Sequence, residues 1–203
     1  MFLIGTKKEH KFLQHPIMSL KKIISGGQTG ADRAALEAAY LYNLETGGWT
    51  PPRFMTSAGS DYSLRDVFNL KAIDYSSSLI LAYIHRSQLN VDESDATVVF
   101  KIYDSPGTDK TIGYCRTARW TNPPSNVIRP YRPVLIISHS VKREDVTIET
   151  WKRDAQRLKT FIVDNNVKVL NVAGHRNTSE DPTWQQRVLQ FLAYALYDSL
   201  YID

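Results

Sequence analysis

The sequence predicts an α/β protein: a single domain with a Rossmann-like, mostly parallel sheet and helices on both faces. Two observations predict this class. Short apolar runs rich in β-branched residues alternate with stretches of helical periodicity, the order expected of parallel strands joined by crossover helices. In addition, no linker, internal repeat or low-complexity tract divides the 203 residues, and a chain of that length can bury one sizeable core.

Composition limits the location and the partners of the protein. No apolar run approaches the ~20 residues of a membrane helix, and the N-terminus lacks the apolar core of a signal peptide, so we expect a soluble, cytoplasmic protein. The net charge is +4 and the only cysteine is Cys115, which excludes an internal disulfide. Because Lys and Arg form no dense tract, a small anionic ligand is favoured over nucleic acid.

The chain divides into an extension and a domain. Residues 1–19 have little periodicity and are expected to form a loosely ordered N-terminal extension. Residues 20–203 are expected to form the ligand-binding domain. Within it, residues 120–133 contain four prolines and predict an inserted, irregular loop that could act as a lid.

The first strand-turn-helix unit contains the strongest motif. Strand-like Ile23-Ile24 precedes the turn Gly26-Gly27-Gln28-Thr29-Gly30-Ala31-Asp32, and a helix is predicted from Ala31 to about Tyr42. Glycines can take positive φ and let a ligand reach backbone N–H groups, and a helix start attracts phosphate. The spacing matches neither common nucleotide-binding fingerprint. The turn therefore either binds phosphate or is a tight turn whose glycines serve packing.

The next segment is harder to assign. Residues 47–53 predict a loop, in which Trp49 could stack on a flat heterocycle or cover the core. Residues 61–74 have no clear pattern, and residues 76–90 are compatible with either a strand or a helix.

A second unit follows. Residues 96–102 are a β-branched run that predicts a buried strand, Ser105–Thr111 predicts a turn, and residues 112–118 predict a helix. Next to Pro106 the turn offers backbone donors around Gly107, the hydroxyls of Thr108 and Thr111, and the Lys110 ammonium, all of which suit phosphate. An ordinary exposed turn is the alternative.

The last third predicts strands at residues 134–138 and 167–173, helices at 148–163 and 183–200, and a third turn at Gly174-His175-Arg176-Asn177. Gly174 permits close approach, while His175 and Arg176 supply donors. Ligands of open parallel sheets bind where such turns meet, outside the carboxyl ends of the strands. The predicted binding residues are Gly26, Gly27, Gln28, Thr29, Gly30, Asp32, Pro106, Gly107, Thr108, Lys110, Thr111, Gly174, His175 and Arg176.

Binding is favoured over catalysis. The sequence has no H-E-x-x-H, no paired cysteines and no G-x-S-x-G, so no dedicated metal site is expected. The candidate acid-base groups are Asp32, Asp95 and His175, none with an evident partner; Asp32 could simply cap its helix, and His175 could be structural. Arg86, Asn90, Ser94 and Asp95 precede the strand at 96–102 and are expected to face away from the ligand edge.

These residues together resemble the molybdenum carrier family, circularly permuted members of the SLOG superfamily of nucleotide-binding proteins, which includes the cytokinin-activating phosphoribohydrolases. The likeness spans about residues 21–200. It lies in Ile24–Ala35, Gly47–Pro51, Asn90–Thr97, Gly107–Thr111 and Leu170–Arg176. The resemblance implies a Rossmann-like fold, often in a homo-oligomer, that holds molybdenum cofactor, a pterin carrying a phosphate.

Three departures qualify this resemblance. Pro106-Gly107 stands where the family has Gly-Gly, His175 stands where it commonly has proline, and Thr111 takes the place of the glutamate used by relatives that cleave nucleoside monophosphates. The leading hypothesis is therefore a binding protein for a phosphorylated heterocycle, either molybdenum cofactor or a nucleotide. The alternatives are a hydrolase or sensor acting on nucleotides or NAD derivatives, with Asp32 or His175 as acid-base group, and an interaction scaffold without a working pocket.

Overall fold

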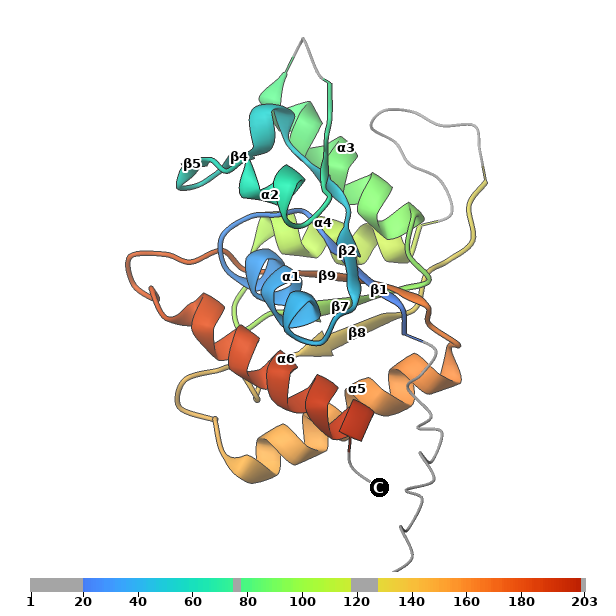
Figure 1. Ribbon diagram of the computed structural model, residues 1–203, viewed down its shortest axis with the longest axis vertical. Helices are drawn as coiled ribbons and strands as arrows, with labels where there is room; N and C mark the ends of the chain where they lie inside the picture. Colours follow the sequence, from blue (N-terminus) through green and yellow to red (C-terminus); the bar gives the residue numbers. More distant parts are fainter. Residues whose placement is uncertain (1–19, 75–77, 118–127, 202–203) are drawn as a thin grey trace, which may run out of the picture.

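A five-stranded parallel sheet forms the centre of the protein, with the strand order β2-β1-β9-β7-β8 (Figure 1). The computed structural model describes residues 20–74, 78–117 and 128–201. The strands are β1 (Lys22–Ser25), β2 (Glu45–Gly47), β7 (Ala96–Phe100), β8 (Val134–Ile137) and β9 (Val169–Gly174). Central β9 pairs with β1 on one side and with β7 on the other. The predicted Rossmann-like α/β class is confirmed.

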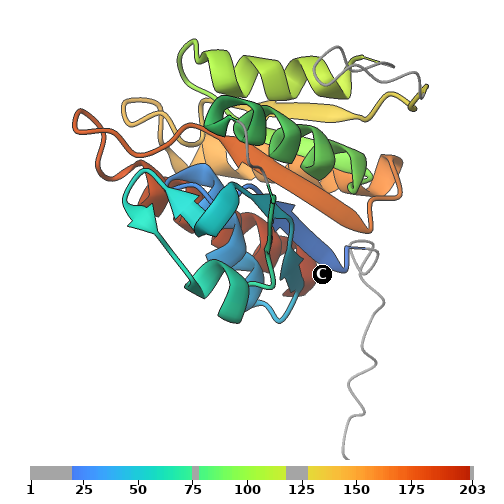
Figure 2. The ribbon, with the colours of Figure 1, turned by 90° about the horizontal axis from the view of Figure 1, so that it is seen from above.

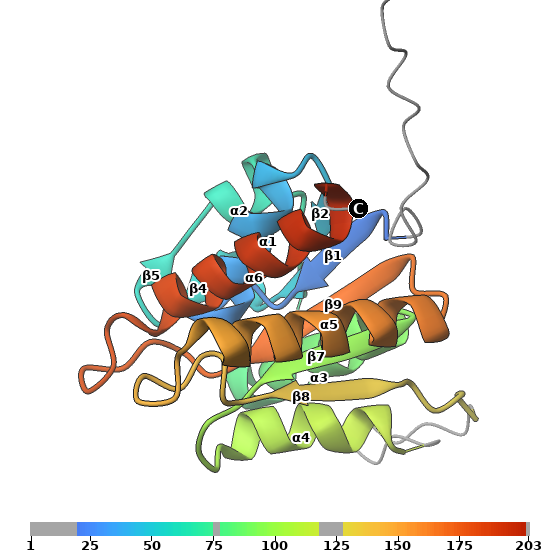
Figure 3. The same ribbon diagram turned by 90° about the horizontal axis from the view of Figure 1, so that it is seen from below.

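Helices cover both faces of this sheet, as Figure 3 shows. One layer consists of α1 (Ala31–Leu41), α5 (Ile148–Asp164) and α6 (Trp184–Tyr201), and the other of α3 (Leu79–Asp92) and α4 (Pro106–Cys115). Side chains alternate between the faces of a strand. Val98, Phe100, Leu170 and Val172 accordingly join the main core with α1, α5 and α6, whereas Asn171 faces the α3 and α4 layer.

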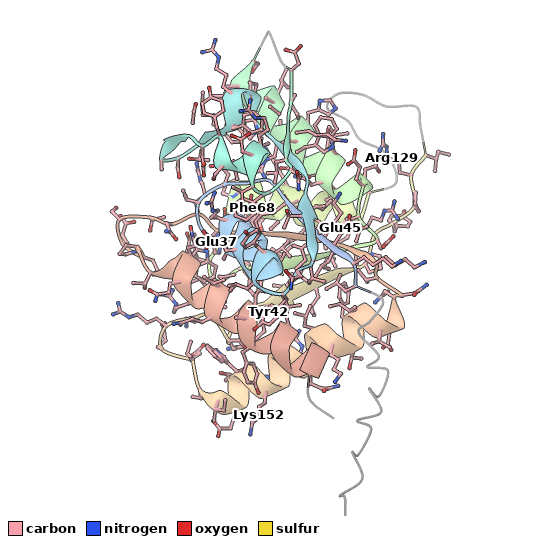
Figure 4. The ribbon with its side chains drawn as sticks, in the orientation of Figure 1. Glu37, Tyr42, Glu45, Phe68, Arg129 and Lys152 are labelled. Carbon is pink, nitrogen blue, oxygen red and sulfur yellow. The ribbon has the colours of Figure 1, made fainter. Side chains whose placement is uncertain are left out.

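Small residues let α1 pack closely against its neighbours, as its sequence predicts. Ala31, Ala34, Ala35 and Ala38 are fully buried. At the end of the helix, Tyr42 lies beside α6, and its hydroxyl donates to the Ala193 carbonyl at 2.9 Å (Figure 4). The first βαβ unit is therefore fixed to the last helix of the chain.

The segment between β2 and α3 folds beside α1 (Figure 2). Its elements are short: β3 (Trp49–Thr50), η2 (Pro52–Phe54), β4 (Met55–Thr56), β5 (Gly59–Ser60), α2 (Ser63–Asp66) and β6 (Lys71–Ala72). A second apolar cluster of Leu36, Phe54, Leu64, Phe68 and Leu70 attaches it to α1. Elements of two to four residues carry too little periodicity to be predicted.

Two helices correct or complete the sequence predictions. The prediction of a turn at Ser105–Thr111 is wrong, because α4 begins at Pro106. Proline suits the first helical position, and the Asp109 carboxylate accepts the Ser105 N–H at 3.2 Å. The ambiguous segment before β7 is helical and forms α3.

Residues 1–19 and 118–127 lie outside the described residues, so the extension and most of the proline-rich loop stay predictions; residues 128–133 have no regular secondary structure. No helix in the described ranges has the length and the apolar character that crossing a bilayer requires.

Candidate ligand-binding site

Three loops meet at the carboxyl edge of the sheet, as predicted, because β1, β9 and β7 are parallel neighbours. Beside them a cavity of about 500 Å³ opens between the sheet, α3 and α4. Its lining combines the three loops with residues of both helices. These are Gly26, Gln28, Asp32, Ile80, Tyr83, Ile84, Arg86, Ser87, Asn90, Ser105, Pro106, Gly107, Thr108, Lys110, Thr111, Tyr114, Asn171, Ala173, Gly174 and Arg176.

One wall of the cavity is the N-terminus of α4. Ser105 is the N-cap residue, but its side chain makes no capping hydrogen bond. The backbone N–H groups of Gly107 and Thr108, at the second and third helical positions, have no acceptor within the helix. The Thr111 hydroxyl donates to the Gly107 carbonyl at 3.2 Å, while Lys110 lies exposed at the rim. This wall presents donors and positive charge.

The facing wall is apolar. Ile80, Tyr83 and Ile84 on α3 line it, and Tyr114 on α4 adds a further aromatic side chain to the cavity. Asn171 of β9 lies beneath, where its amide donates to the Thr97 hydroxyl at 3.2 Å. A flat ring can pack against such a wall, because aromatic and aliphatic side chains favour contact with apolar surfaces.

A mostly buried ion pair closes the inner end of the cavity. Arg86 Nη1 lies 3.0 Å from Asp32 Oδ2, which also accepts the Gln28 N–H at 3.3 Å. Burial raises the pKa of the Asp32 carboxyl, and Arg86 opposes this effect without reversing it. An ideal Cβ at Gly26 would lie 1.0 Å from Arg86 Nη1. A methyl group at position 26 would therefore displace the Arg86 guanidinium, which occupies this space.

The prediction that Arg86 and Asn90 face away from the ligand edge is wrong, since both line the cavity. With 14 residues and a rise of ~1.5 Å per residue, α3 starts near the carboxyl edge and runs back along the sheet. Arg86 sits midway along it. Asp95, in contrast, lies at the amino edge as expected, accepting the backbone N–H groups of Lys168 and Val169 at 2.8 Å.

Several backbone donors of the glycine-rich loop have acceptors within the protein. The Gly27 N–H reaches Ser25 Oγ at 3.2 Å, the Gly30 N–H reaches Gln185 Oε1 at 3.1 Å, and the Ala31 N–H reaches the His175 carbonyl at 3.0 Å. A Cβ at Gly30 would lie 2.4 Å from that carbonyl oxygen. The structure therefore agrees with the packing interpretation of this loop.

Gly27 and Thr29 face the other side of the loop. They line a smaller hollow beside the β4–β5 hairpin, where Thr29 Oγ1 and Ser57 Oγ lie 2.6 Å apart. The Gln28 amide attaches the same hairpin by donating to the Met55 carbonyl at 2.9 Å. Of the predicted binding residues, Gly27, Thr29, Gly30 and His175 do not line the main cavity, and the others do.

His175 is buried and acts as an acceptor, which corrects its predicted role as a donor. Its Nε2 accepts the N–H groups of Ile102 at 3.0 Å and Tyr103 at 3.3 Å. Burial, with the positive charge of Lys101, lowers the pKa of His175 to about 4. The acid-base candidates Asp32, Asp95 and His175 thus all have partners, contrary to expectation.

Trp49 does not line the main cavity either. Its backbone N–H donates to Asn90 Oδ1 at 2.8 Å and its carbonyl accepts from Asn90 Nδ2 at 3.0 Å. The Lys71 ammonium lies 5.3 Å from the centre of its ring. Asn90 therefore joins α3 to β3, and neither predicted role of Trp49, stacking on a ligand or covering the core, is tested.

The fold and the cavity define a Rossmann-like α/β protein whose carboxyl sheet edge opens into a pocket of the size that small ligands occupy. Residues 23–196 match the model of the circularly permutated YpsA SLOG family, and the chain belongs to this family. A solved structure from Syntrophus aciditrophicus, named a putative molybdenum carrier protein, is similar. The two chains share 27% identity with a TM-score of 0.67, over 88% of this chain and 96% of the other. No curated protein matches significantly. The resemblance inferred from the motifs is confirmed.

Proposed function

We propose that this protein binds a small phosphorylated heterocycle, with the phosphate on the first turn of α4 and the ring against α3. One observation carries the proposal: the uncapped N-terminus of α4 opens into a cavity whose facing wall is apolar. The positive end of a helix and free backbone N–H groups favour a phosphate. Lys110 and Arg176 add positive charge at the rim.

The phosphate is assigned to α4 alone. The loop from Gly26 to Asp32 was an equal candidate from its sequence, but four of its N–H groups, those of Gly27, Gln28, Gly30 and Ala31, already donate to Ser25, Asp32, Gln185 and His175. In this proposal the loop positions Arg86 and Asp32 at the inner end of the cavity.

Molybdenum cofactor fits this chemistry, and the name of the similar structure favours it. The α4 donors suit its phosphate and the apolar wall suits its pterin. The lining offers no histidine or cysteine, and its one carboxylate, Asp32, is paired with Arg86. Among the described residues no cluster of metal-binding side chains occurs. The chain's own residues would therefore hold the phosphate and the ring, and the cofactor would carry the metal.

Enzymatic turnover of a nucleotide is the second candidate, because Asp32 is the one acidic side chain in the lining. Its raised pKa suits a proton donor better than an ordinary carboxyl. Incubation with a panel of nucleoside monophosphates and NAD derivatives, followed by chromatography, tests this. Products formed by the wild type and lost in Asp32→Asn would favour the enzyme over the binding protein.

Titration of the ¹⁵N-labelled protein with inorganic phosphate, adenosine monophosphate and a phosphorylated pterin tests the binding proposal. We expect the amide signals of Gly107 and Thr108 to shift, and the two heterocyclic ligands to bind more tightly than phosphate. Lys110→Ala should weaken phosphate binding about threefold to tenfold. Lys168→Ala is the matched control, because this exposed lysine follows α5 at the amino edge. Failure of every ligand to shift the α4 amides would contradict the proposal.

A homo-oligomer, which the resemblance implies, stays a prediction. Analytical ultracentrifugation of the purified protein would test it directly, with and without added ligand. A sedimentation coefficient of a 23.2 kDa monomer at all concentrations would contradict it.

A further inference from the structure

His175 joins elements from both layers of helices through its imidazole ring and its backbone. The ring accepts two N–H groups of the β7–α4 loop, from Ile102 and Tyr103. It also stacks on the Tyr103 ring, with the centroids 3.8 Å apart and the planes 5° from parallel. Two acceptor contacts and one stacking contact fix this loop against the end of β9.

The backbone of His175 makes the complementary contacts. Its carbonyl accepts the N–H of Ala31, the first residue of α1, at 3.0 Å and Trp184 Nε1, in the first residue of α6, at 2.8 Å. Its own N–H donates to the Phe100 carbonyl at 3.3 Å. One residue therefore contacts the start of α1, the start of α6 and the loop that leads into α4.

The two contacts at Nε2 define the state of the ring. A nitrogen that accepts N–H groups carries a lone pair, so the imidazole is neutral with its proton on Nδ1. The low pKa of His175, about 4, agrees with this state. Within the described part of the chain, Nδ1 is buried and has no hydrogen-bond partner. A buried donor without a partner is unfavourable, and the ring nevertheless adopts this orientation.

The chain between the ring contacts and α4 is short. Tyr103 is followed by Asp104, the N-cap Ser105 and the first helical residue, Pro106. A second contact shapes the loop locally, since Lys101 Nζ lies 2.6 Å from Asp109 Oδ1. Lys101 and Asp109 lie on either side of the turn, whereas His175 comes from another strand. The contacts of His175 therefore fix the position of the start of α4 relative to the other loops at the carboxyl edge of the sheet.

We propose that His175 is a positioning residue, which holds the β7–α4 loop so that the Gly107 and Thr108 donors face the cavity. This inference rests on the proposed function, since the donors are those assigned to the phosphate. His175 itself does not line the cavity and acts through the loop. Its role is distinct from the acid-base role expected from the sequence.

Two substitutions separate the contribution of the Nε2 acceptor from that of ring stacking on Tyr103. His175→Gln can place an amide oxygen near the Nε2 position, whereas His175→Phe keeps a flat ring for Tyr103 but removes the acceptor. We expect His175→Gln to bind inorganic phosphate within about threefold of the wild type and His175→Phe to bind about tenfold more weakly, a difference of about 1.4 kcal/mol. Both should retain cooperative urea unfolding.

Trp184→Phe is the control for a merely structural effect. It removes the hydrogen bond to the His175 carbonyl and creates space in the core, so it should lower stability while leaving phosphate affinity within about twofold of the wild type. Equal phosphate affinity in His175→Phe and the wild type, or equal losses in His175→Phe and Trp184→Phe, would overturn the proposal.

Two measurements without ligand keep this test independent of the proposed function. Imidazole ¹⁵N shifts should report a proton on Nδ1 and none on Nε2. Hydrogen exchange of the Ile102 and Tyr103 amides should be slow in the wild type and at least about tenfold faster in His175→Phe. If the wild type bound no phosphate, the proposed function would fail. Slow exchange of the Ile102 and Tyr103 amides in the wild type would still support the role of His175 in holding the β7–α4 loop. Equally fast exchange of these amides in the wild type and in His175→Phe would overturn the proposal that His175 holds the β7–α4 loop.

Discussion

The N-termini of α1 and α4 lie at the same edge of the sheet but differ in the backbone N–H donors that they leave for a ligand. The loop before α1 has three glycines, and its Gly27, Gly30 and Ala31 N–H groups donate to acceptors within the protein. The start of α4 has one glycine and no side-chain cap from Ser105, and helix geometry leaves the Gly107 and Thr108 N–H groups without an intrahelical acceptor. Glycine content is therefore a poor guide to available donors, because glycines also serve close packing.

The surroundings of the glycines explain the difference. A Cβ at Gly30 would meet the His175 carbonyl and one at Gly26 would meet Arg86, whereas one at Gly107 would meet nothing within 4 Å. The first loop is a junction where α1, α3 and β9 come together. The second stands open to the cavity, so it is the better candidate for a ligand.

Substitution of single glycines should reveal this contrast most strongly. Gly30 has φ 95° and its Cβ would lie 2.4 Å from a backbone oxygen, so Gly30→Ala should lower the free energy of unfolding by about 3 kcal/mol or more. Gly107→Ala should stay within about 1 kcal/mol of the wild type, because alanine favours a helix. Urea unfolding measures both. Similar losses at the two positions would contradict the contrast.

A double-mutant cycle tests the junction at Gly26. Gly26→Ala should displace the Arg86 guanidinium from Asp32 and cost about 3 kcal/mol, because it leaves a mostly buried carboxyl without its partner. In an Arg86→Met background the same alanine should cost at least about 1 kcal/mol less, because the guanidinium is absent. Additive losses in urea unfolding would show that Gly26 does not act through Arg86.

Local pattern was sufficient to predict strands β1, β7, β8 and β9 of the sheet and most of its helices, but not the edge strand β2. The β-branched runs of β7 and β8 and the alanine face of α1 each carry their own signal, since a buried strand and a close-packed helix demand those residues. The turn at 105–111 was mistaken because proline and glycine suit both a turn and the first turn of a helix. The small elements between β2 and α3 are held by tertiary contacts and have no period of their own.

The cavity was predicted in part. Parallel topology placed the loops after β1, β7 and β9 together, and ten of the predicted residues do line it. Arg86 was missed because its position depends on whether residues 76–90 form a helix, which their mixed pattern left open. The choice of partners for Asp32 and His175 depends on residues distant in the sequence, Arg86 and Ile102, and no motif encodes such contacts.

The pH dependence of the unfolding free energy should report the protonation of the buried His175 imidazole. His175 has a pKa of about 4 in the folded protein, against about 6.5 in unfolded chains. The unfolded state therefore binds more protons between these values, and stability should fall by up to about 3 kcal/mol as the pH falls from 6.5 to 4. Asp32, whose pKa is raised, acts in the opposite direction. The difference in unfolding free energy between wild type and His175→Gln across this range isolates the histidine, and a constant difference would refute the assignment.

The smallest expected effects compare one threonine from each loop. Thr108 lies in the first turn of α4 and lines the cavity, whereas Thr29 faces the hairpin, with its hydroxyl 2.6 Å from that of Ser57. Thr108→Ala should weaken inorganic phosphate binding about threefold, since a hydroxyl contributes a modest hydrogen bond. Thr29→Ala should leave the affinity unchanged and lower stability by no more than about 1 kcal/mol. Titrations at one ionic strength compare the two, because phosphate binding is sensitive to salt. A larger loss of affinity in Thr29→Ala than in Thr108→Ala would move the phosphate to the glycine-rich loop and reverse the contrast between the two helix starts.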